Sequence, residues 1–203
     1  DFERAVELYR QLLNTDMDRR EEHYREQALL QLGYIFLDEL NQPDSAEVYL
    51  ERLLRGQYKT EALLALGKAA VLEGDLQLAL DRYSAVVRPG FMNNQELSSE
   101  ALLEQGQILF WQGEVDSALG IWNVLARRYP MTDAANDALV EITTFGGEGR
   151  DSAGVRLYSE ASLQAAQRKY AQALEVYHRL REYSGGEPLG ARATLESAKT
   201  YRL

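Results

Sequence analysis

The chain has no cysteine, and it holds only two histidines, His23 and His178, among its 203 residues. Without thiols it forms no disulfide, thiolate zinc site, iron–sulfur cluster or cysteine nucleophile. Two histidines are too few for a histidine-rich metal site within the chain. We therefore expect no metal and no other cofactor.

Positive charge is also scarce, because 22 basic residues stand against 32 acidic ones and the formal net charge is −10. Nucleic-acid backbones and anionic membranes repel an acidic surface, which argues against nucleic acid as a partner. No apolar run approaches the roughly 18 residues of a membrane helix. The longest, residues 62–72, is interrupted by Gly67 and Lys68. We expect no insertion into a membrane.

The chain has only four prolines, and all of them fall between segments with helical periodicity. Short breaks such as Glu73-Gly74-Asp75 are of the kind that joins antiparallel helices. The pattern predicts helices near residues 1–13, 20–40, 43–55, 58–73, 75–88, 95–112, 115–129, 132–145, 151–168, 170–183 and 187–203.

A spacing of small and large residues repeats along the chain. A glycine inside one helix is followed by an alanine 12 or 13 residues later and by a large residue four positions after that. It occurs as Gly33, Ala46 and Leu50, as Gly67, Ala79 and Tyr83, and as Gly106, Ala118 and Trp122.

This spacing has a mechanical interpretation. A small residue on the first helix lets a second antiparallel helix approach closely, and the alanine meets it there. The large residue, one turn later, is expected to fill the gap between neighbouring hairpins. One hairpin cannot bury its apolar face alone, so hairpins are expected to stack.

At these residues the chain resembles the tetratricopeptide-repeat (TPR) family, most clearly from Ala101 to Pro130. The resemblance implies an all-α, right-handed superhelical solenoid of antiparallel helix hairpins with about eleven helices. We expect one such domain over residues 1–203, as a fragment of a longer protein, since the chain begins at Asp1 inside a helical pattern.

Two places depart from the regular spacing. Residues 88–94 form a longer loop, and the side chains of Phe91 and Met92 are expected to pack beneath this loop. Ala118 and Ala173 are 55 residues apart, which is 34 plus 21, the length of one extra helix and a loop. This predicts an irregular helix within residues 132–168, either near 132–145 or near 151–168, and a break in the stacking at 146–151.

No motif indicates catalysis. The glycine-rich run at 146–152 lacks the Gly-Lys-Ser/Thr ending of a phosphate loop. Neither histidine has a neighbouring arrangement that suggests activation, so both are expected on the surface. We expect no catalytic, metal or cofactor-binding residue, and we do not expect an enzyme.

The resemblance implies a partner-binding groove lined by the first helix of each hairpin. Trp111 with Phe110 is the most suggestive pair, because exposed aromatic residues anchor interfaces. Carried over to this chain, the groove residues are Leu30, Tyr34, Leu37, Leu64, Lys68, Val71, Leu103, Gln107, Phe110 and Trp111.

The expected function is that of a protein-interaction scaffold that holds a peptide segment or helix of a partner protein. The alternatives are a non-catalytic helical domain of a larger, cell-wall-acting enzyme and a self-associating assembly module. The turn at residues 127–138 is similar to bacterial envelope TPR proteins, such as those of the Tol-Pal system and the barrel-assembly lipoprotein. That similarity predicts a periplasmic or outer-membrane-associated location, with the cytoplasm as the alternative.

Overall fold

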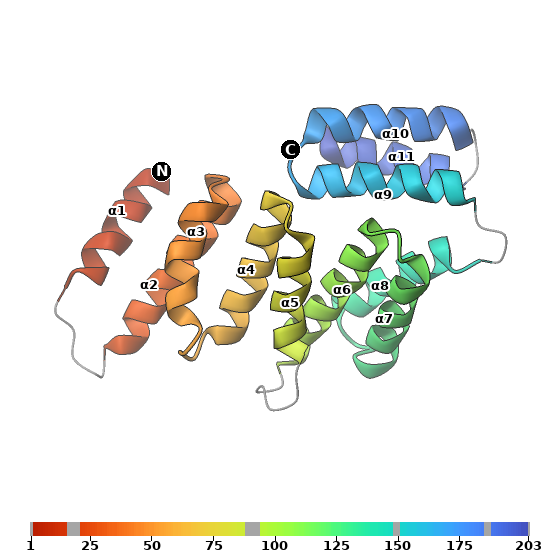
Figure 1. Cartoon of the computed structure of the whole chain (residues 1–203). Coiled ribbons are helices and arrows are strands. Elements are labelled where there is room, and N and C mark those ends of the chain that lie inside the picture. Colours follow the sequence, from red (N-terminus) through yellow and green to blue (C-terminus); the bar gives the residue numbers. More distant parts are fainter. Residues whose placement is uncertain (1, 16–20, 88–93, 148–150, 185–187, 203) are drawn as a thin grey trace. The chain divides into compact units, whose positions relative to one another are not determined.

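The fold is all-α in the part of the chain that the structure, a computed structural model, describes: residues 2–15, 21–87, 94–147, 151–184 and 188–202. These residues contain eleven α-helices (Figure 1) and no strand, which confirms the predicted class. The chain divides into two compact units, Asp1–Leu97 and Ser98–Leu203. The expectation of one solenoid domain stays a prediction. The loop at 88–94, apart from Asn94, lies outside the described residues.

The first unit contains two helix hairpins preceded by a single helix, α1 (Phe2–Leu13). The first hairpin pairs α2 (Glu22–Tyr34), which continues as the π-helical segment η1 (Ile35–Glu39), with α3 (Pro43–Leu50) and the short 3₁₀ segment η2 (Glu51–Leu53). The second pairs α4 (Lys59–Glu73) with α5 (Leu76–Val87). Leucines and alanines of these helices form the core.

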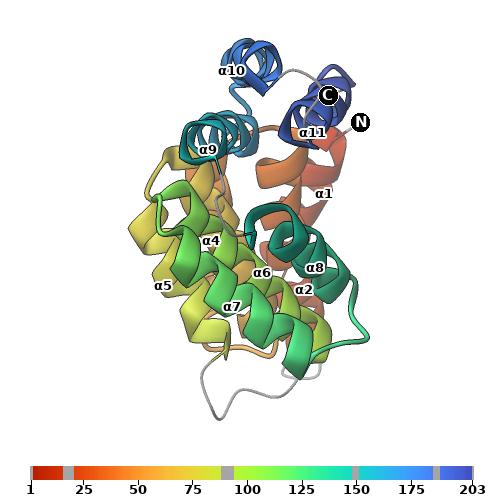
Figure 2. The same cartoon turned by 90° about the vertical axis from the view of Figure 1, so that its right-hand side faces the viewer.

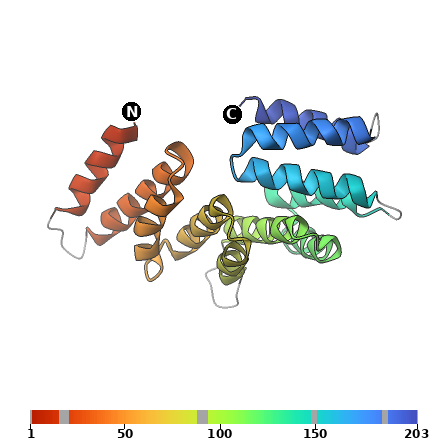
Figure 3. The ribbon, with the colours of Figure 1, turned by 45° about the horizontal axis from the view of Figure 1, so that its top comes forward.

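The second unit begins within α6 (Gln95–Trp111) and continues through α7 (Val115–Arg128) and α8 (Asp133–Phe145). Figure 2 shows these three helices side by side. The chain ends with α9 (Ser152–Ala166), α10 (Tyr170–Ser184) and α11 (Pro188–Thr200). Helix α10 packs on both α9 and α11 (Figure 3).

Each hairpin turn contains one residue in the left-handed region of backbone conformation. These residues are Asn41, Gly74, Gly113 and Arg168, with φ of 52°, 90°, 84° and 57°. A left-handed residue ends a helix and lets the following amide bond back to the last helical turn. The amides of Asp75, Glu114 and Lys169 make this bond to the carbonyl five residues earlier. The repeated turn therefore marks α2/α3, α4/α5, α6/α7 and α9/α10 as hairpins.

The repeat glycines lie where a second helix comes closest. A Cβ atom on Gly67 would lie 2.5 Å from the Tyr83 ring, and one on Gly33 would lie 2.3 Å from Leu50. The large residue of each repeat thus packs directly over the glycine of its own hairpin. This corrects the expectation that it fills only the gap between hairpins, because the space that the glycine opens is already taken by that side chain.

The irregular helix predicted within 132–168 is α8. It packs on α7, and the α9/α10 hairpin follows it, so one single helix separates two hairpins. Of the predicted break at 146–151, residues 148–150 lie outside the described part of the chain, and the break stays a prediction.

Asp151 caps the N-terminus of α9, and we expect its loss to be measurable. Its carboxylate accepts hydrogen bonds from the amides of Ala153 and Gly154, both at 3.1 Å, and from the Tyr183 hydroxyl at 3.0 Å. Asp151→Ala should lower the free energy of unfolding by about 1–2 kcal/mol, because these donors lose their acceptor. Asp151→Asn, which also caps helices well, should lose less than half of that in urea unfolding. Equal losses would contradict the capping role.

Candidate partner-binding site

The ten residues of the predicted groove differ widely in exposure. Five have buried side chains and pack in the interior of their own units: Leu30, Leu37, Leu64, Val71 and Phe110. Tyr34, Leu103, Gln107 and Trp111 are half-buried, and Lys68 is exposed. The interior five offer little side-chain area to a partner, so the accessible part of the predicted set is the other five.

Phe110 was expected to form an exposed aromatic pair with Trp111, and the structure corrects this. Its side chain is 0% exposed and its ring lies 4.6 Å from that of Phe145 and 6.0 Å from that of Trp122. Phe110 therefore belongs to the core of the second unit. Trp111, the next residue along α6, points away from that core toward a cavity.

In the first unit, the exposed groove residue Lys68 is already engaged. Its ammonium group pairs with the carboxylate of Asp38 on η1, and both side chains are about half exposed. A surface pair of this kind contributes about 0–1 kcal/mol to stability. Lys68 therefore adds no unbalanced positive charge to the surface of α4.

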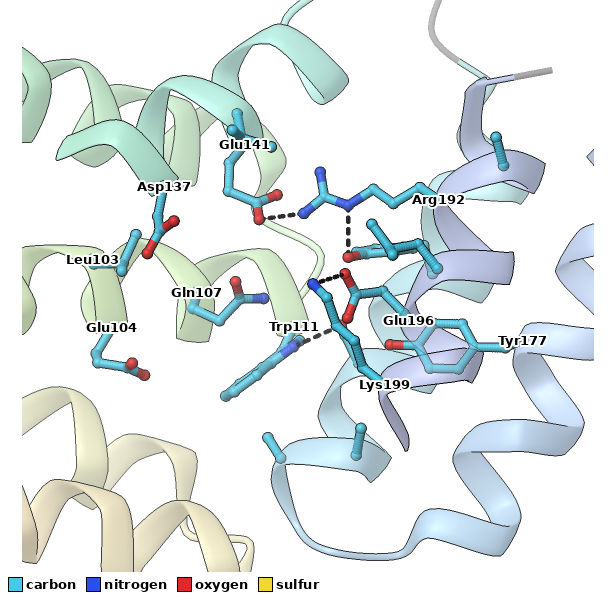
Figure 4. A pocket seen from close by; sticks show the side chains of 17 residues that line it. Leu103, Glu104, Gln107, Trp111, Asp137, Glu141, Tyr177, Arg192, Glu196 and Lys199 are labelled. Carbon is cyan, nitrogen blue, oxygen red and sulfur yellow. Dashed lines mark hydrogen bonds and ion pairs between the residues drawn. The ribbon is translucent and has the colours of Figure 1, made fainter. Parts of the chain in front are cut away.

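The second unit contains a cavity of about 760 Å³, walled by α6, α8, α9 and α11 with one residue from α10 (Figure 4). Its α6 wall consists of Leu103, Glu104, Gln107 and Trp111. Three predicted groove residues thus come together, because positions 103, 107 and 111 are four apart and share one helix face. This cavity is the candidate site.

The opposite wall is organised by Arg192 of α11. Its guanidinium donates to the Tyr158 hydroxyl and to Thr144 Oγ1, both at 2.8 Å, and it forms an ion pair with Glu141 of α8. It also lies over the Tyr158 ring, 4.8 Å from the centroid. One side chain therefore ties α11 to α8 and α9 and fixes this wall of the cavity.

Burial sets the protonation of these wall groups. It raises the pKa of Tyr158 and of Tyr177 far above the usual tyrosine value, so both hydroxyls stay protonated. Burial also raises the pKa of the Glu141 carboxyl, while the Arg192 guanidinium beside it lowers that pKa. This wall thus presents two neutral tyrosine hydroxyls and one ion pair, between Glu141 and Arg192.

The cavity lining is acidic overall. It contains the carboxylates of Glu104, Asp137, Glu141 and Glu196, and the cations are Arg192 and Lys199, so the lining carries a net charge of −2. Lys199 pairs with Glu196 at 2.8 Å. Both cations of the lining thus have a carboxylate partner within it.

The remaining sequence candidates lie away from this cavity. His23 and His178 are exposed, as expected, and His178 lies 3.6 Å from Glu182. Over the described ranges, no group of three or more histidines and carboxylates is arranged to hold a metal ion. No helix among those residues has the length and apolar character needed to cross a membrane.

Sequence reasoning missed the α8, α9 and α11 walls, because these residues follow no repeat spacing. Glu141 and Arg192 are 51 positions apart, and neither belongs to a motif. One weak signal existed. Arg192 is flanked by Gly190, Ala191 and Ala193, small residues that let a helix approach its neighbours closely.

Comparison with known proteins gives a result consistent with this geometry. Two family models, both described as tetratricopeptide repeat, match the chain, one over residues 30–94 and the other over residues 100–130. The first range begins near the end of α2 and covers α3 and the α4/α5 hairpin, and the second covers most of α6 and all of α7. No curated protein matches the chain.

Proposed function

Because the chain belongs to the tetratricopeptide-repeat family, whose repeats generally mediate protein–protein interaction, we propose that it binds a segment of a partner protein in the cavity of its second unit. The segment is an extended peptide or one face of a helix. Binding is non-covalent and needs no catalytic group. The chain would act as a scaffold that brings this partner to whatever else it contacts.

The observation that supports this proposal most is the α6 face made by Leu103, Gln107 and Trp111. The three side chains are half-buried and line the cavity together. The Trp111 indole donates a hydrogen bond to Ser162 Oγ at 2.9 Å, which holds its ring in place. A wall fixed before binding reduces the ordering cost of association. The same surface thus offers apolar area, which supplies affinity, and polar groups, which fix the register of a bound segment.

Filling the cavity should weaken partner binding. Gln107→Trp places a bulky ring in the middle of the α6 wall, and we expect partners retained by the wild-type chain to bind at least about tenfold more weakly. Met131→Trp is the matched control, because Met131 is 92% exposed and lies outside the cavity lining. The measurement is affinity capture of partners from cells that express the protein, followed by titration of each captured partner.

Circular dichroism should show that both variants keep the wild-type helix content. An identical set of partners and affinities for wild type and Gln107→Trp would refute the assignment of the cavity. Sedimentation at several concentrations addresses self-association separately. A dimer that is lost in Gln107→Trp would identify a second copy of the chain as the occupant.

A location in the bacterial envelope stays part of the proposal, supported by the turn at 127–138. The structure gives this turn a local role, since Thr132 caps α8 by accepting a hydrogen bond from the Ala135 amide and Tyr129 is buried. Fractionation of the native cells with an antibody against the chain tests the location, and a signal confined to the cytoplasmic fraction would refute it.

A further inference from the structure

We propose that two copies of the chain associate weakly through helix α1, which pairs with α1 of the second copy in an antiparallel arrangement. This association goes beyond the binding of a partner in the cavity and does not depend on it. It rests on a row of apolar side chains that is open on α1 and covered on every equivalent helix that the structure describes.

Helix α1 carries the pattern of the second helix of a hairpin. An alanine, a large residue four positions later and an apolar residue seven positions later recur on α3 with η2, on α5, on α7 and on α10. In α1 these residues are Ala5, Tyr9 and Leu12. They share one face of the helix, because steps of four and three residues return to the same side.

On the other four second helices this row is covered. Each of its members is at most 3% exposed: Ala46, Leu50, Leu53, Ala79, Tyr83, Val86, Ala118, Trp122, Leu125, Ala173, Tyr177 and Leu180. In the first three of these hairpins, a glycine of the antiparallel first helix lies against the large residue of the row. In the α9/α10 hairpin the small residue at the same spacing is Ala161, which is 0% exposed.

On α1 the same row is open. The helix packs on α2 and η1 of the first unit (Figure 1), and Ala5 and Tyr9 are only half-buried. Leu12 is 36% exposed, and Leu8, which extends the same face, is 51% exposed. The chain thus covers this row four times and leaves it uncovered once. An antiparallel helix that presents a small residue is what fits it.

A second copy of α1 supplies such a helix. When two copies of α1 pair antiparallel about a twofold axis near Leu8 and Tyr9, Ala5 of each copy lies opposite Leu12 of the other. Each copy then offers both the small and the large residue, as an interface of a surface with itself requires.

Helix α11 fits the row less well. Gly33 and Gly67 are 34 residues apart, and the residue that lies 34 positions beyond Ala161 is Leu195. Leu195 is 55% exposed, so α11 presents a large side chain where a close crossing needs a small one. This difference favours pairing of α1 with α1 over pairing of α1 with α11.

The charge of α1 also favours this contact. The chain carries a net charge of −10, so two copies repel each other overall. Residues 2–13, however, contain two acidic and two basic residues, Glu3, Glu7, Arg4 and Arg10, and are neutral in sum. Salt screens the repulsion between the remaining charges, so we expect association to strengthen as salt rises. One short helix offers less area than a standard interface of about 1,600 Å², so we expect a reversible dimer with a Kd of about 10–100 µM.

The first test is sedimentation equilibrium of the whole chain at concentrations up to several times this Kd. Leu8→Glu should weaken the dimer about tenfold or more, because it places two carboxylates beside the axis. Val48→Glu is the matched control, since Val48 is 62% exposed on α3 of the same unit. It should change the affinity less than about threefold. Circular dichroism should show wild-type helix content for both variants.

The second test determines the direction of pairing. The chain has no cysteine, so a single introduced thiol reports only on its own surroundings. Ala5→Cys and Leu12→Cys are mixed in equal amounts and oxidised mildly, with the two chains distinguished by mass. Antiparallel pairing should make the mixed disulfide more than about 80% of the cross-linked product, whereas random collision gives about half.

Four outcomes would overturn the proposal. The first is a chain that stays monomeric throughout the concentration range. The second is a dimer that Leu8→Glu leaves intact, and the third is a random distribution of disulfides. A dimer lost in Gln107→Trp but kept in Leu8→Glu would place the contact in the cavity instead. A monomer whose Leu8→Glu variant loses captured partners would show that a helix of another protein covers α1.

Discussion

Replacing Arg192 by alanine is expected to lower the free energy of unfolding of the second unit by about 3–5 kcal/mol. The Arg192 and Glu141 side chains are each only 15% exposed, so removing one leaves the other as a poorly hydrated charge without its partner. The variant also loses the hydrogen bonds to Tyr158 and Thr144. These contacts join three helices, and we expect α11 to detach first.

A double variant separates the pair from the rest of the site. Arg192→Met combined with Glu141→Met removes both charges and fills the space with apolar side chains of similar length. Such replacements of a buried ion pair are often close to neutral. The double variant should therefore be more stable than Arg192→Met alone. If the two losses simply add, the two charges do not stabilise one another.

The loss in Arg192→Ala should also depend on pH. Burial raises the pKa of Glu141, and Arg192 opposes this effect, so the pKa rises further when Arg192 is absent. A carboxyl whose pKa is higher in the folded state disfavours folding above that pKa and ceases to do so as the pH falls through it. The deficit relative to wild type should therefore shrink between about pH 8 and about pH 5.

Tryptophan fluorescence in urea measures these effects selectively. The chain has two tryptophans, Trp111 and Trp122, and both belong to the second unit. The fluorescence transition therefore reports this unit, while circular dichroism follows both units. An unchanged fluorescence midpoint in Arg192→Ala would contradict the role assigned to the pair.

The hairpins were predictable because their signal is local. A glycine, and a large residue sixteen or seventeen positions later, must occur in sequence wherever two helices of one hairpin cross closely. The structure also explains why the spacing in the first hairpin is one residue longer. Ala46 follows Gly33 by thirteen residues rather than twelve, and the π-helical segment Ile35–Glu39 accommodates the additional residue.

The orientation of Phe110 could also have been deduced. Phe110 lies four residues after Gly106, so both face α7 across the hairpin, whereas Trp111 is rotated by about 100° around the helix axis. The prediction grouped the two aromatics by adjacency in sequence and overlooked this rotation. Helix periodicity assigns Phe110 to the core and leaves Trp111 on the face shared with Leu103 and Gln107.

The α8–α11 part of the candidate site was not predictable in the same way. Its contacts join residues far apart in sequence, such as Trp111 with Ser162 and Glu141 with Arg192. No periodicity specifies them, because α8 is a single helix between two hairpins. The 21 extra residues predicted that an additional helix exists, but only the structure shows which helices α8 contacts.

Gly106→Leu is expected to have the second large effect, a loss of about 3 kcal/mol in the free energy of unfolding of the second unit. Even a Cβ atom at this position would lie 2.2 Å from Trp122 Nε1. The indole is fully buried and donates a hydrogen bond to the Leu103 carbonyl at 3.3 Å, so it cannot move aside without losing that bond. The clash outweighs the gain of about 0.8 kcal/mol in helix propensity.

Gly120→Leu is the matched control, because Gly120 lies on the exposed side of α7 with no neighbouring atom within 4 Å of an added Cβ. It should leave the urea midpoint unchanged or raise it slightly, by the propensity gain alone. A combined Gly106→Leu, Trp122→Ala variant should lose less than the two single losses added, since the leucine then occupies space that the indole vacated. Strict additivity would show that the glycine and the tryptophan do not share one space, and the packing interpretation of the repeat would fail with it.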